Sequence, residues 1–258
     1  MNSKIKVSII TPTFNSGSTI SSNLESVFKQ SYKNWELIIV DNLSQDQTLN
    51  IIKRYDKKKI RVFSGKDRGI YDAINRGIKT AKGSIISILH SDDFYYNKSS
   101  LLNIVNAFNQ SQADVVYGNL IYVKKHNINN ILRFWKSRQF KKGDFNKGWS
   151  PAHPSFFVKK NIYKKLGNYR INMGNASDFE LMYRFLEKND VKNKYINKTL
   201  VTMRYGGSSN KTIYNILNQN LRIIRVLNIN FNILKLCNFL FSKLFERLSQ
   251  FIKRPNKK

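Results

Sequence analysis

Two adjacent carboxylates, Asp92 and Asp93, follow a short apolar run in the first half of the sequence. Carboxylate oxygens are hard ligands that suit Mg²⁺ or Mn²⁺, and such a cation can bridge to phosphate oxygens. Aspartate is also common in turns and at helix N-termini, so the pair by itself is compatible with a simple turn. The strands and helices that carry Asp92, Asp93 and the other acids indicate whether the pair is a metal site or a simple turn.

The first hundred residues alternate short apolar runs with amphipathic segments. We expect strands at 7–11, 37–41, 60–63 and 84–89, with helices at about 18–30, 47–55 and 70–81 between them. Short apolar runs separated by helices are typical of parallel strands that are covered on both faces. The predicted fold is therefore a doubly wound α/β sheet, in which ligands gather at the carboxyl ends of the strands.

Polar or acidic residues lie at or just beyond the ends of these four strands. They are Thr11-Pro12, Asp41-Asn42, Asp67 and Asp92-Asp93. Because the carboxyl ends of parallel strands meet at one edge of a sheet, we expect these residues to converge. Their convergence favours a ligand site over a turn at Asp92-Asp93.

Beyond a predicted helix at about 99–110 the pattern changes. We expect longer strands of mixed polarity at 114–123 and 131–135, shorter strands at 155–158 and 200–205, and a helix at 178–188. The sheet should therefore be mostly parallel but mixed in its second half. We find no linker long enough to divide residues 1–210, which we expect to form one domain followed by a basic helical extension over 211–258.

Several motifs occur in an order that resembles glycosyltransferase family 2, the inverting enzymes of the GT-A fold. They are VSIITPTFN at 7–15, WELIIVD at 35–41, DRGIYDAINRG at 67–77, AKG at 81–83, and Ser91-Asp92-Asp93 in the place of the family's Asp-x-Asp metal motif. Further motifs at 151–157, 177–184 and 206–208 resemble a branch that builds bacterial surface polysaccharides of the O-antigen, capsule or colanic-acid type. The resemblance extends over roughly residues 5–210.

This resemblance implies a nucleotide-sugar donor bound by residues 1–115 and an acceptor bound by residues 116–210. The residues that match the family's donor site are Thr11, Pro12, Asn15, Asp41, Asp67, Tyr71, Asp72, Asn75, Ser91 and Asp92. Asp41 would accept a hydrogen bond from the nucleotide base, although it could instead cap the loop after its strand. Asp93 is the implied ligand of Mg²⁺ or Mn²⁺, and Asp92 either contacts the donor or shares the metal.

The resemblance places the base of the reaction at Asp178. An inverting transfer needs one carboxylate to take the proton from the attacking hydroxyl. Ser177-x-x-Glu180 has the form of a capping box, which would make Ser177 the N-cap and put Asp178 in the first turn, where the helix dipole favours an ionised carboxylate. Glu180 is the alternative base, and Asp178 could also be an ordinary first-turn acid.

Two residues of the loop at 141–154 are candidates for contact with the acceptor. His153 and Trp149 lie among prolines, and imidazole and indole rings suit stacking on a sugar. A loop histidine that bonds only to the backbone is an equal alternative for His153.

The net charge of +29 and the pI of about 10.2 are compatible with nucleic acid, an anionic membrane or anionic substrates, and also with a biased composition. The stretch 211–258 contains ten lysines and arginines against one acid, and apolar residues recur at helical spacing within 229–252. A basic amphipathic helix suits a position in an anionic membrane interface, while packing on the domain is the alternative.

The expected location is cytoplasmic and peripheral, on the inner face of the cytoplasmic membrane. The single cysteine, Cys237, suits a reducing compartment, and we find no apolar run of about 20 residues that would span a membrane. The first strand begins near Lys6, which leaves no room for a secretory signal ahead of it.

The sequence therefore predicts an inverting, metal-dependent, non-processive glycosyltransferase that moves one sugar, from UDP by default, to a polyprenyl-linked saccharide. The chain lacks the Gln-x-x-Arg-Trp motif of processive synthases. One alternative is a sugar-phosphate nucleotidyltransferase, which would need a Gly-rich basic N-terminal loop that the chain lacks. The other is a non-catalytic basic module for nucleic acid or lipid, which the acids at the strand ends disfavour; we expect no nucleic-acid partner.

Overall fold

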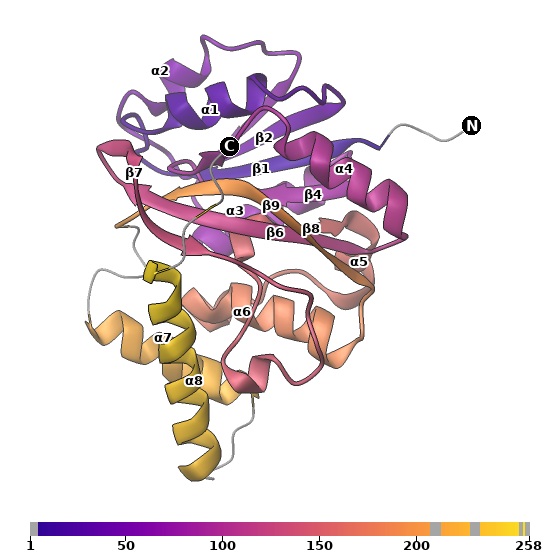
Figure 1. Ribbon diagram of the computed structural model, residues 1–258. Helices are drawn as coiled ribbons and strands as arrows, with labels where there is room; N and C mark the ends of the chain where they lie inside the picture. The colour runs from indigo at the N-terminus through magenta and orange to yellow at the C-terminus, as the bar shows by residue number, and fades with distance from the viewer. Residues whose placement is uncertain (1–4, 207–212, 228–232, 253–254, 256–258) are drawn as a thin grey trace.

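The computed structural model describes residues 5–206, 213–227, 233–252 and 255 (Figure 1). Within these residues nine strands form one sheet. Its order is β3-β2-β1-β4-β8-β6-β9-β5, and β7 pairs with β6 outside this path.

The first half of the sheet is parallel. Its strands are β1 (Val7–Thr13), β2 (Trp35–Asp41), β3 (Ile60–Ser64) and β4 (Ile85–Ile88), and its helices are α1 (Ile20–Phe28), α2 (Thr48–Ile52) and α3 (Ile70–Thr80). Every residue of β1, β2 and β4 is buried, as expected for strands covered on both faces. The strand and helix predictions for this half are confirmed to within a few residues.

The second half mixes both directions. Its elements are β5 (Phe94–Tyr95), α4 (Ser100–Ser111), β6 (Val115–Lys124), β7 (Asn127–Trp135), β8 (Phe156–Lys159), α5 (Lys160–Leu166) and β9 (Asn193–Arg204). The pairs β4–β8, β6–β8, β6–β7 and β5–β9 are antiparallel, whereas β6–β9 is parallel. Several features of this half were not predicted, among them the short strand β5. α5 follows β8 without a loop, and β9 begins seven residues earlier than expected because its polar first part pairs with β6.

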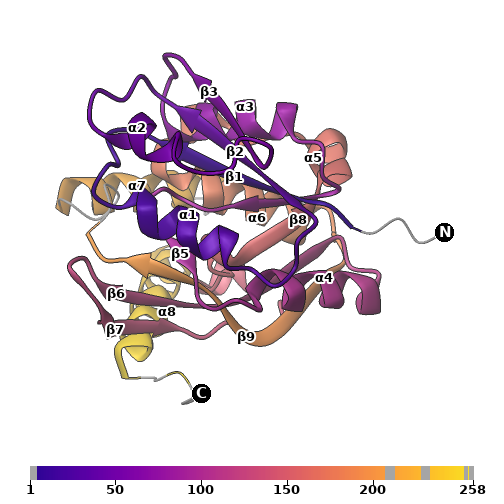
Figure 2. The same ribbon diagram turned by 90° about the horizontal axis from the view of Figure 1, so that it is seen from above.

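Helices cover both faces of the sheet (Figures 1 and 2), and a hydrophobic cluster lies on each face. On one face α1, α2 and α4 pack on residues such as Ile9, Leu37 and Ile39. On the other face α3, α5 and α6 (Ser177–Met182) pack on residues such as Ile10, Ile38 and Tyr117. This arrangement leaves the carboxyl ends of the parallel strands as a common edge.

The capping box predicted at Ser177 is wrong. A 3₁₀ helix, η3 (Ile171–Ala176), leads directly into α6, and Ser177 itself has helical backbone angles. Its hydroxyl donates to the carbonyls of Arg170 and Gly174 rather than to a free N–H group. Glu180 pairs with Arg170 and Arg184, so it does not reach back to the start of the helix.

Two helices, α7 (Ile213–Leu227) and α8 (Ile233–Ile252), lie at the lower end of the molecule in Figure 1. α8 packs on β7 and on η1 (Phe145–Lys147), with Phe239 and Gln250 buried. Its opposite side exposes Phe241, Leu244, Phe245, Leu248 and Ile252. Gly207, Ser208 and positions 228–232 and 253–254 lie outside the described residues, and none of the described helices is long and apolar enough to cross a membrane.

Candidate active site

The ends of β1, β2 and β3 lie side by side, as their motifs predicted. Thr13 is in register with Asp41, and Asp41 with Ser64. Parallel pairing thus brings three polar residues, far apart in the sequence, to one edge of the sheet.

Asp41 is buried and is held by hydrogen bonds within this edge. Its carboxylate accepts from the backbone N–H of Ser44 at 3.1 Å, from the Ser44 hydroxyl, and from the Ser64 hydroxyl at 2.7 Å. Asn15, which has a left-handed backbone (φ 46°), joins the loop after β1 to the same segment: its N–H donates to Ser44 and its side chain accepts from Gln45. Asp41 therefore orders two loops at the edge.

The candidate residues on and before α3 are also engaged with neighbours. Asp67 accepts from the N–H of Gly69, and Asp72 pairs with Arg68 at 3.2 Å. Both polar atoms of the Asn75 amide bond to the backbone of Tyr169, at 2.8 and 3.0 Å. Asn75 thus fixes α3 to the segment that precedes η3.

Ser91, Asp92 and Asp93 lie between β4 and β5, and several residues hold their backbone. The Asn23 amide donates to the carbonyls of His90 and Asp93, and Arg204 donates to the carbonyl of Asp92 at 2.5 Å. The Ser91 hydroxyl bonds to Ser16 at 2.8 Å. The backbone is thereby fixed while the two carboxylates remain available for a ligand.

Unsatisfied polar atoms gather at this motif. Asp93 is fully buried, and neither of its carboxylate oxygens has a hydrogen-bond partner among the described residues; the same is true of the Nδ1 atom of His90. Burial, followed by the charge of Asp92, raises the pKa of Asp93 well above its ordinary value. A hard cation would satisfy these oxygens and offset the burial of the charge, so the donor set fits Mg²⁺ or Mn²⁺.

The protein side chains do not complete a coordination shell. No group of three or more His, Cys, Asp or Glu side chains gathers at one point in the part of the chain that the structure describes. A cation at Asp93 and Asp92 would therefore take further ligands from water or from a bound phosphate.

Asp178, at the start of α6, lies beside the donor half of the molecule. Tyr71 of α3 is close enough that the charge of Asp178 adds to burial in raising the pKa of its phenol, and the Tyr71 ring stacks on Tyr169 at 5.5 Å. Tyr169 in turn bonds through its hydroxyl to His153 at 2.7 Å. These contacts connect the first half of the sheet to α6.

Burial sets the protonation of Asp178. It raises the pKa of this carboxyl from 3.8 to about 6, while hydrogen bonds from the backbone, including the 2.7 Å bond from the N–H of Phe179, act in the opposite direction. The carboxylate is thus ionised at neutral pH and binds a proton more readily than an exposed aspartate. The alternative base, Glu180, is held by two arginines.

The two acceptor candidates have different surroundings. His153 is buried, and burial followed by the charge of His90 lowers its pKa to about 3, so its ring is neutral. Trp149 is 4% exposed, with the guanidinium of Arg138 over its ring at 4.3 Å, so its ring offers no free face for a sugar. Its role in the structure is to pack the core.

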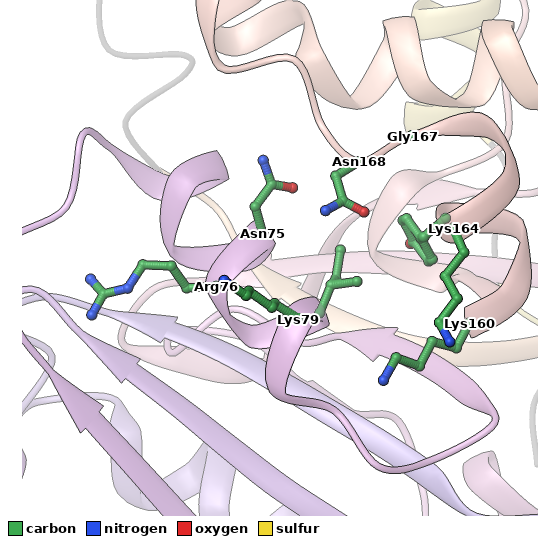
Figure 3. Close-up of a pocket in the computed structure, with 9 residues that line it drawn as sticks. Asn75, Arg76, Lys79, Lys160, Lys164, Gly167 and Asn168 are labelled. Atoms are coloured by element: carbon green, nitrogen blue, oxygen red, sulfur yellow. The ribbon is translucent and has the colours of Figure 1, made fainter.

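A separate basic pocket of about 680 Å³ lies between α3 and α5 (Figure 3). Arg76, Lys79, Lys160 and Lys164 are among the residues that line it. It lies away from the Ser91–Asp93 motif and includes only Asn75 of the predicted donor residues.

Asn23 and Arg204 were not singled out in the sequence. Both act on the backbone of the Asp92-Asp93 segment from elements that are distant in the chain, α1 and β9. The only signal was that Arg204 lies just before Gly206 in a motif shared with the family.

Comparison with known proteins agrees with this geometry. Residues 8–167 match the pattern of Glycosyl transferase family 2. A PGL/p-HBAD biosynthesis glycosyltransferase of Mycobacterium bovis is 25% identical over 80% of this chain and 80% of its own length. A UDP-Glc:alpha-D-GlcNAc-diphosphoundecaprenol beta-1,3-glucosyltransferase, WfgD of Escherichia coli, is 32% identical over 47% of this chain and 48% of its own length.

Solved structures show the same fold. S. aureus TarS 1-349 in complex with UDP-GlcNAc superposes with a TM-score of 0.67 at 19% identity, covering 95% of this chain and 73% of that chain. The mannosyltransferase PcManGT from Pyrobaculum calidifontis, in complex with GDP-Man and Mn²⁺, gives 0.63 at 16% identity, with 96% and 72% covered. The sheet and its acidic edge define a glycosyltransferase with the GT-A fold. More specifically, this chain belongs to glycosyltransferase family 2.

Proposed function

We propose that this protein transfers one sugar, with inversion and with the help of a divalent cation, from a nucleotide-diphosphate-sugar to a hydroxyl of a lipid-linked saccharide in surface-polysaccharide biosynthesis. The observation that carries this proposal is a pair of buried carboxylates whose charges both act on Tyr122: Asp93 with unsatisfied oxygens, and Asp178 with a raised pKa. TarS binding UDP-GlcNAc supports a UDP-sugar as the default donor, and the name of WfgD supports a diphosphate-linked lipid acceptor.

Asp178 acts as the base of the reaction. Its carboxylate takes the proton of the acceptor hydroxyl as that oxygen attacks the anomeric carbon, and the bond to the nucleoside diphosphate breaks in the same step. Burial makes this carboxylate a stronger proton acceptor than an exposed aspartate, yet it stays ionised at neutral pH. Tyr71, beside Asp178, brings the donor half of the molecule close to this base.

Asp93 and Asp92 would hold Mg²⁺ or Mn²⁺. When bound, the cation neutralises negative charge on the diphosphate of the donor. Asn23 and Arg204, which fix the backbone of this segment, keep the two carboxylates oriented for that role.

The rest of the donor pocket is formed at the edge of the sheet. Asp41, ordered by Ser44 and Ser64, reads the nucleotide base. Thr11, Pro12 and Asn15, from β1 and the loop after it, contribute to the same pocket. Residues 1–115 thus form the donor-binding half, and residues 116–210 the acceptor-binding half. Asp67, Tyr71, Asp72, Asn75 and Ser91 contribute to the donor half.

The protein works at the inner face of the cytoplasmic membrane, where a polyprenyl-linked acceptor is found. α8 supports this location because it exposes Phe245 (68%), Ile252 (82%) and Phe241 (71%) in a segment rich in lysine and arginine. Exposed apolar side chains beside cationic residues suit the interface of an anionic membrane.

A donor screen tests the proposal. Purified protein is incubated with a panel of nucleotide-sugars and Mg²⁺ or Mn²⁺, with and without a lipid-linked acceptor extract, and the release of nucleoside diphosphate is followed. We expect release that depends on both the extract and the cation. Release of pyrophosphate from a nucleoside triphosphate and a sugar phosphate would instead indicate a nucleotidyltransferase and overturn the proposal.

A further inference from the structure

Three cationic side chains lie along the interface between the domain and the inner side of α8: Arg133 on β7, and Lys243 and Arg247 one helical turn apart on α8. None of them lies within 4.0 Å of a carboxylate oxygen in the residues that the structure describes. Arg184, which is also shielded from solvent, pairs with an acid, whereas the buried Arg204 donates to a backbone carbonyl instead. This cluster therefore differs from the solvated positive charges elsewhere on the surface.

The cluster is a built feature of the fold. Arg133 is 6% exposed, donates from Nε to Gln250 Oε1 at 2.6 Å, and lies 4.7 Å from the ring centre of Tyr122. Its guanidinium also faces the rings of Trp135 at 5.1 Å and Phe251 at 5.8 Å. Buried contacts of this kind hold the guanidinium in one place.

Lys243 is fixed in a similar way. It donates to Asn220 of α7 at 2.7 Å. The backbone of α8 approaches Gly148 so closely that a Cβ atom there would lie 2.8 Å from the amide nitrogen of Lys243, and Gly148 has a left-handed backbone (φ 73°). A glycine at this position allows α8 to sit directly over η1, with Lys243 turned towards the domain.

Electrostatics connects the cluster to the site. Burial, together with the charge of Arg247, lowers the pKa of Lys243 to about 8, while the charge of Asp178 acts in the opposite direction. Burial raises the pKa of Tyr122, and the charges of Arg133, Asp93, Arg247 and Asp178 also act on it, so this phenol is near the cations and both carboxylates. Gathering like charges in a partly buried place is costly, and a bound anion would offset that cost.

We propose that Arg133, Lys243 and Arg247 bind the diphosphate group of a diphosphate-linked lipid acceptor. This inference rests on the proposed function and adds the residues that would recognise its acceptor. Arginine and lysine are the side chains that bind phosphate oxygens, and three of them are enough to neutralise the two negative charges of a diphosphate diester.

The position of the cluster assigns it to the acceptor rather than to the donor. β7 pairs with β6, which β4 and β8 separate from β1, β2 and β3, whose loops form the nucleotide edge, and α8 packs on β7. Lys243 is an electrostatic neighbour of Asp178, the base that acts on the acceptor hydroxyl. The other side of α8 exposes Leu244, Phe245 and Leu248, so a diphosphate held here has an apolar surface nearby for its lipid chain.

Binding of geranyl diphosphate, a short and soluble prenyl diphosphate, tests the inference by isothermal titration calorimetry. EDTA is present, so that no cation links the diphosphate to Asp92 or Asp93. We expect the Lys243→Gln/Arg247→Gln variant to bind geranyl diphosphate at least tenfold more weakly than the unmodified protein. The affinity of Arg247→Lys should decrease less than threefold. The matched control is Lys79→Gln/Lys164→Gln, which removes the same charge from the basic pocket of Figure 3 and should lose less than twofold.

Several outcomes overturn the inference. One is an equal loss of affinity in the control variant, which would show that only the overall charge of the protein matters. The others are equal affinity for geraniol, and no binding of geranyl diphosphate to the unmodified protein. If the double variant fails to fold, Arg247→Gln alone provides the comparison, because Arg247 is partly exposed.

A second titration separates this inference from the proposed function. UDP and other nucleoside diphosphates are titrated with Mg²⁺ or Mn²⁺ present, and we expect binding that is unchanged in the α8 variants. Absence of any nucleotide binding would contradict the proposed function, whatever the result with geranyl diphosphate.

Discussion

The carboxylates of the nucleotide edge differ from those at the centre of the site. At the edge, Asp41 accepts three hydrogen bonds, and a hydrogen bond from Thr48 lowers the pKa of Asp46. At the centre, burial raises the pKa values of Asp93 and Asp178. A carboxylate whose partners lie within the protein shapes a loop, whereas one that is buried without enough partners is available to a cation or a proton.

We expect the largest loss of activity from Asp178→Asn. The amide cannot accept the proton of the acceptor, and general base catalysis contributes about 10²–10⁴-fold, so we expect transfer to fall by that factor. Release of nucleoside diphosphate in the presence of acceptor measures it, and nucleotide binding should be retained. Transfer at the original rate would show that Asp178 is not the base.

The pH dependence gives a second measure of Asp178. Because its pKa is about 6 and the ionised form is needed, kcat/KM should fall about tenfold per pH unit below 6. The folded protein binds this proton more tightly than the unfolded chain, so the ionised carboxylate lowers stability as the pH rises from 3.8 to about 6. The change in thermal midpoint caused by Asp178→Asn should therefore be more favourable at pH 8, where the native carboxyl is ionised, than at pH 3.5, where it is protonated.

The next largest effect is expected for Asp93→Asn. Loss of a charged ligand weakens the binding of the cation, and with it the binding of the donor's diphosphate. We therefore expect transfer to fall by about 10²-fold or more. Titration of Mn²⁺ against activity should show a higher requirement in this variant. Full activity of the unmodified protein in EDTA would contradict the metal assignment. The same titration of Asp92→Asn shows which of the two acids is the main metal ligand.

Asp41→Asn tests the nucleotide edge, where the effect should be on stability. An asparagine cannot accept all three hydrogen bonds, which costs about 1–3 kcal/mol for the buried group left unsatisfied. We expect a lower thermal midpoint and a higher KM for the donor. Asp46→Asn, at an exposed position of the same loop, is the control with the smaller expected change. An unchanged midpoint for Asp41→Asn would contradict this account of the edge.

The smallest effect on stability is expected for Phe245→Ser/Ile252→Ser on α8. Both side chains are largely exposed, so the thermal midpoint should stay the same. Co-sedimentation with anionic vesicles should nevertheless decrease, because the apolar surface that enters the membrane interface is smaller. Equal sedimentation of the variant and the unmodified protein would argue against membrane contact by α8.

Most of the first half of the fold could be predicted from the sequence, because its strands are short apolar runs whose period is unambiguous. In the second half, the residues at which strands and helices begin and end could not be predicted as well. The polar start of β9 is a strand only because β6 offers it a partner, and α5 lacks a loop that would separate it from β8. The helix at Asp178 was found, but its capping was not, since η3 already supplies the preceding turn.

The sequence by itself determined that polar residues would meet at one edge of a sheet, because parallel strands place their carboxyl ends together. It also predicted Asp92, Asp93 and Asp178 as site residues, through motifs that resemble those of a family. Only the tertiary structure decided which of these acids are left without partners, because burial and hydrogen bonding depend on distant residues such as Asn23 and Arg204. In the same way, the contacts of α8 with Arg133 and Gly148 decided that it turns Phe239, Lys243 and Gln250 towards the domain and leaves apolar side chains such as Phe245 and Ile252 exposed.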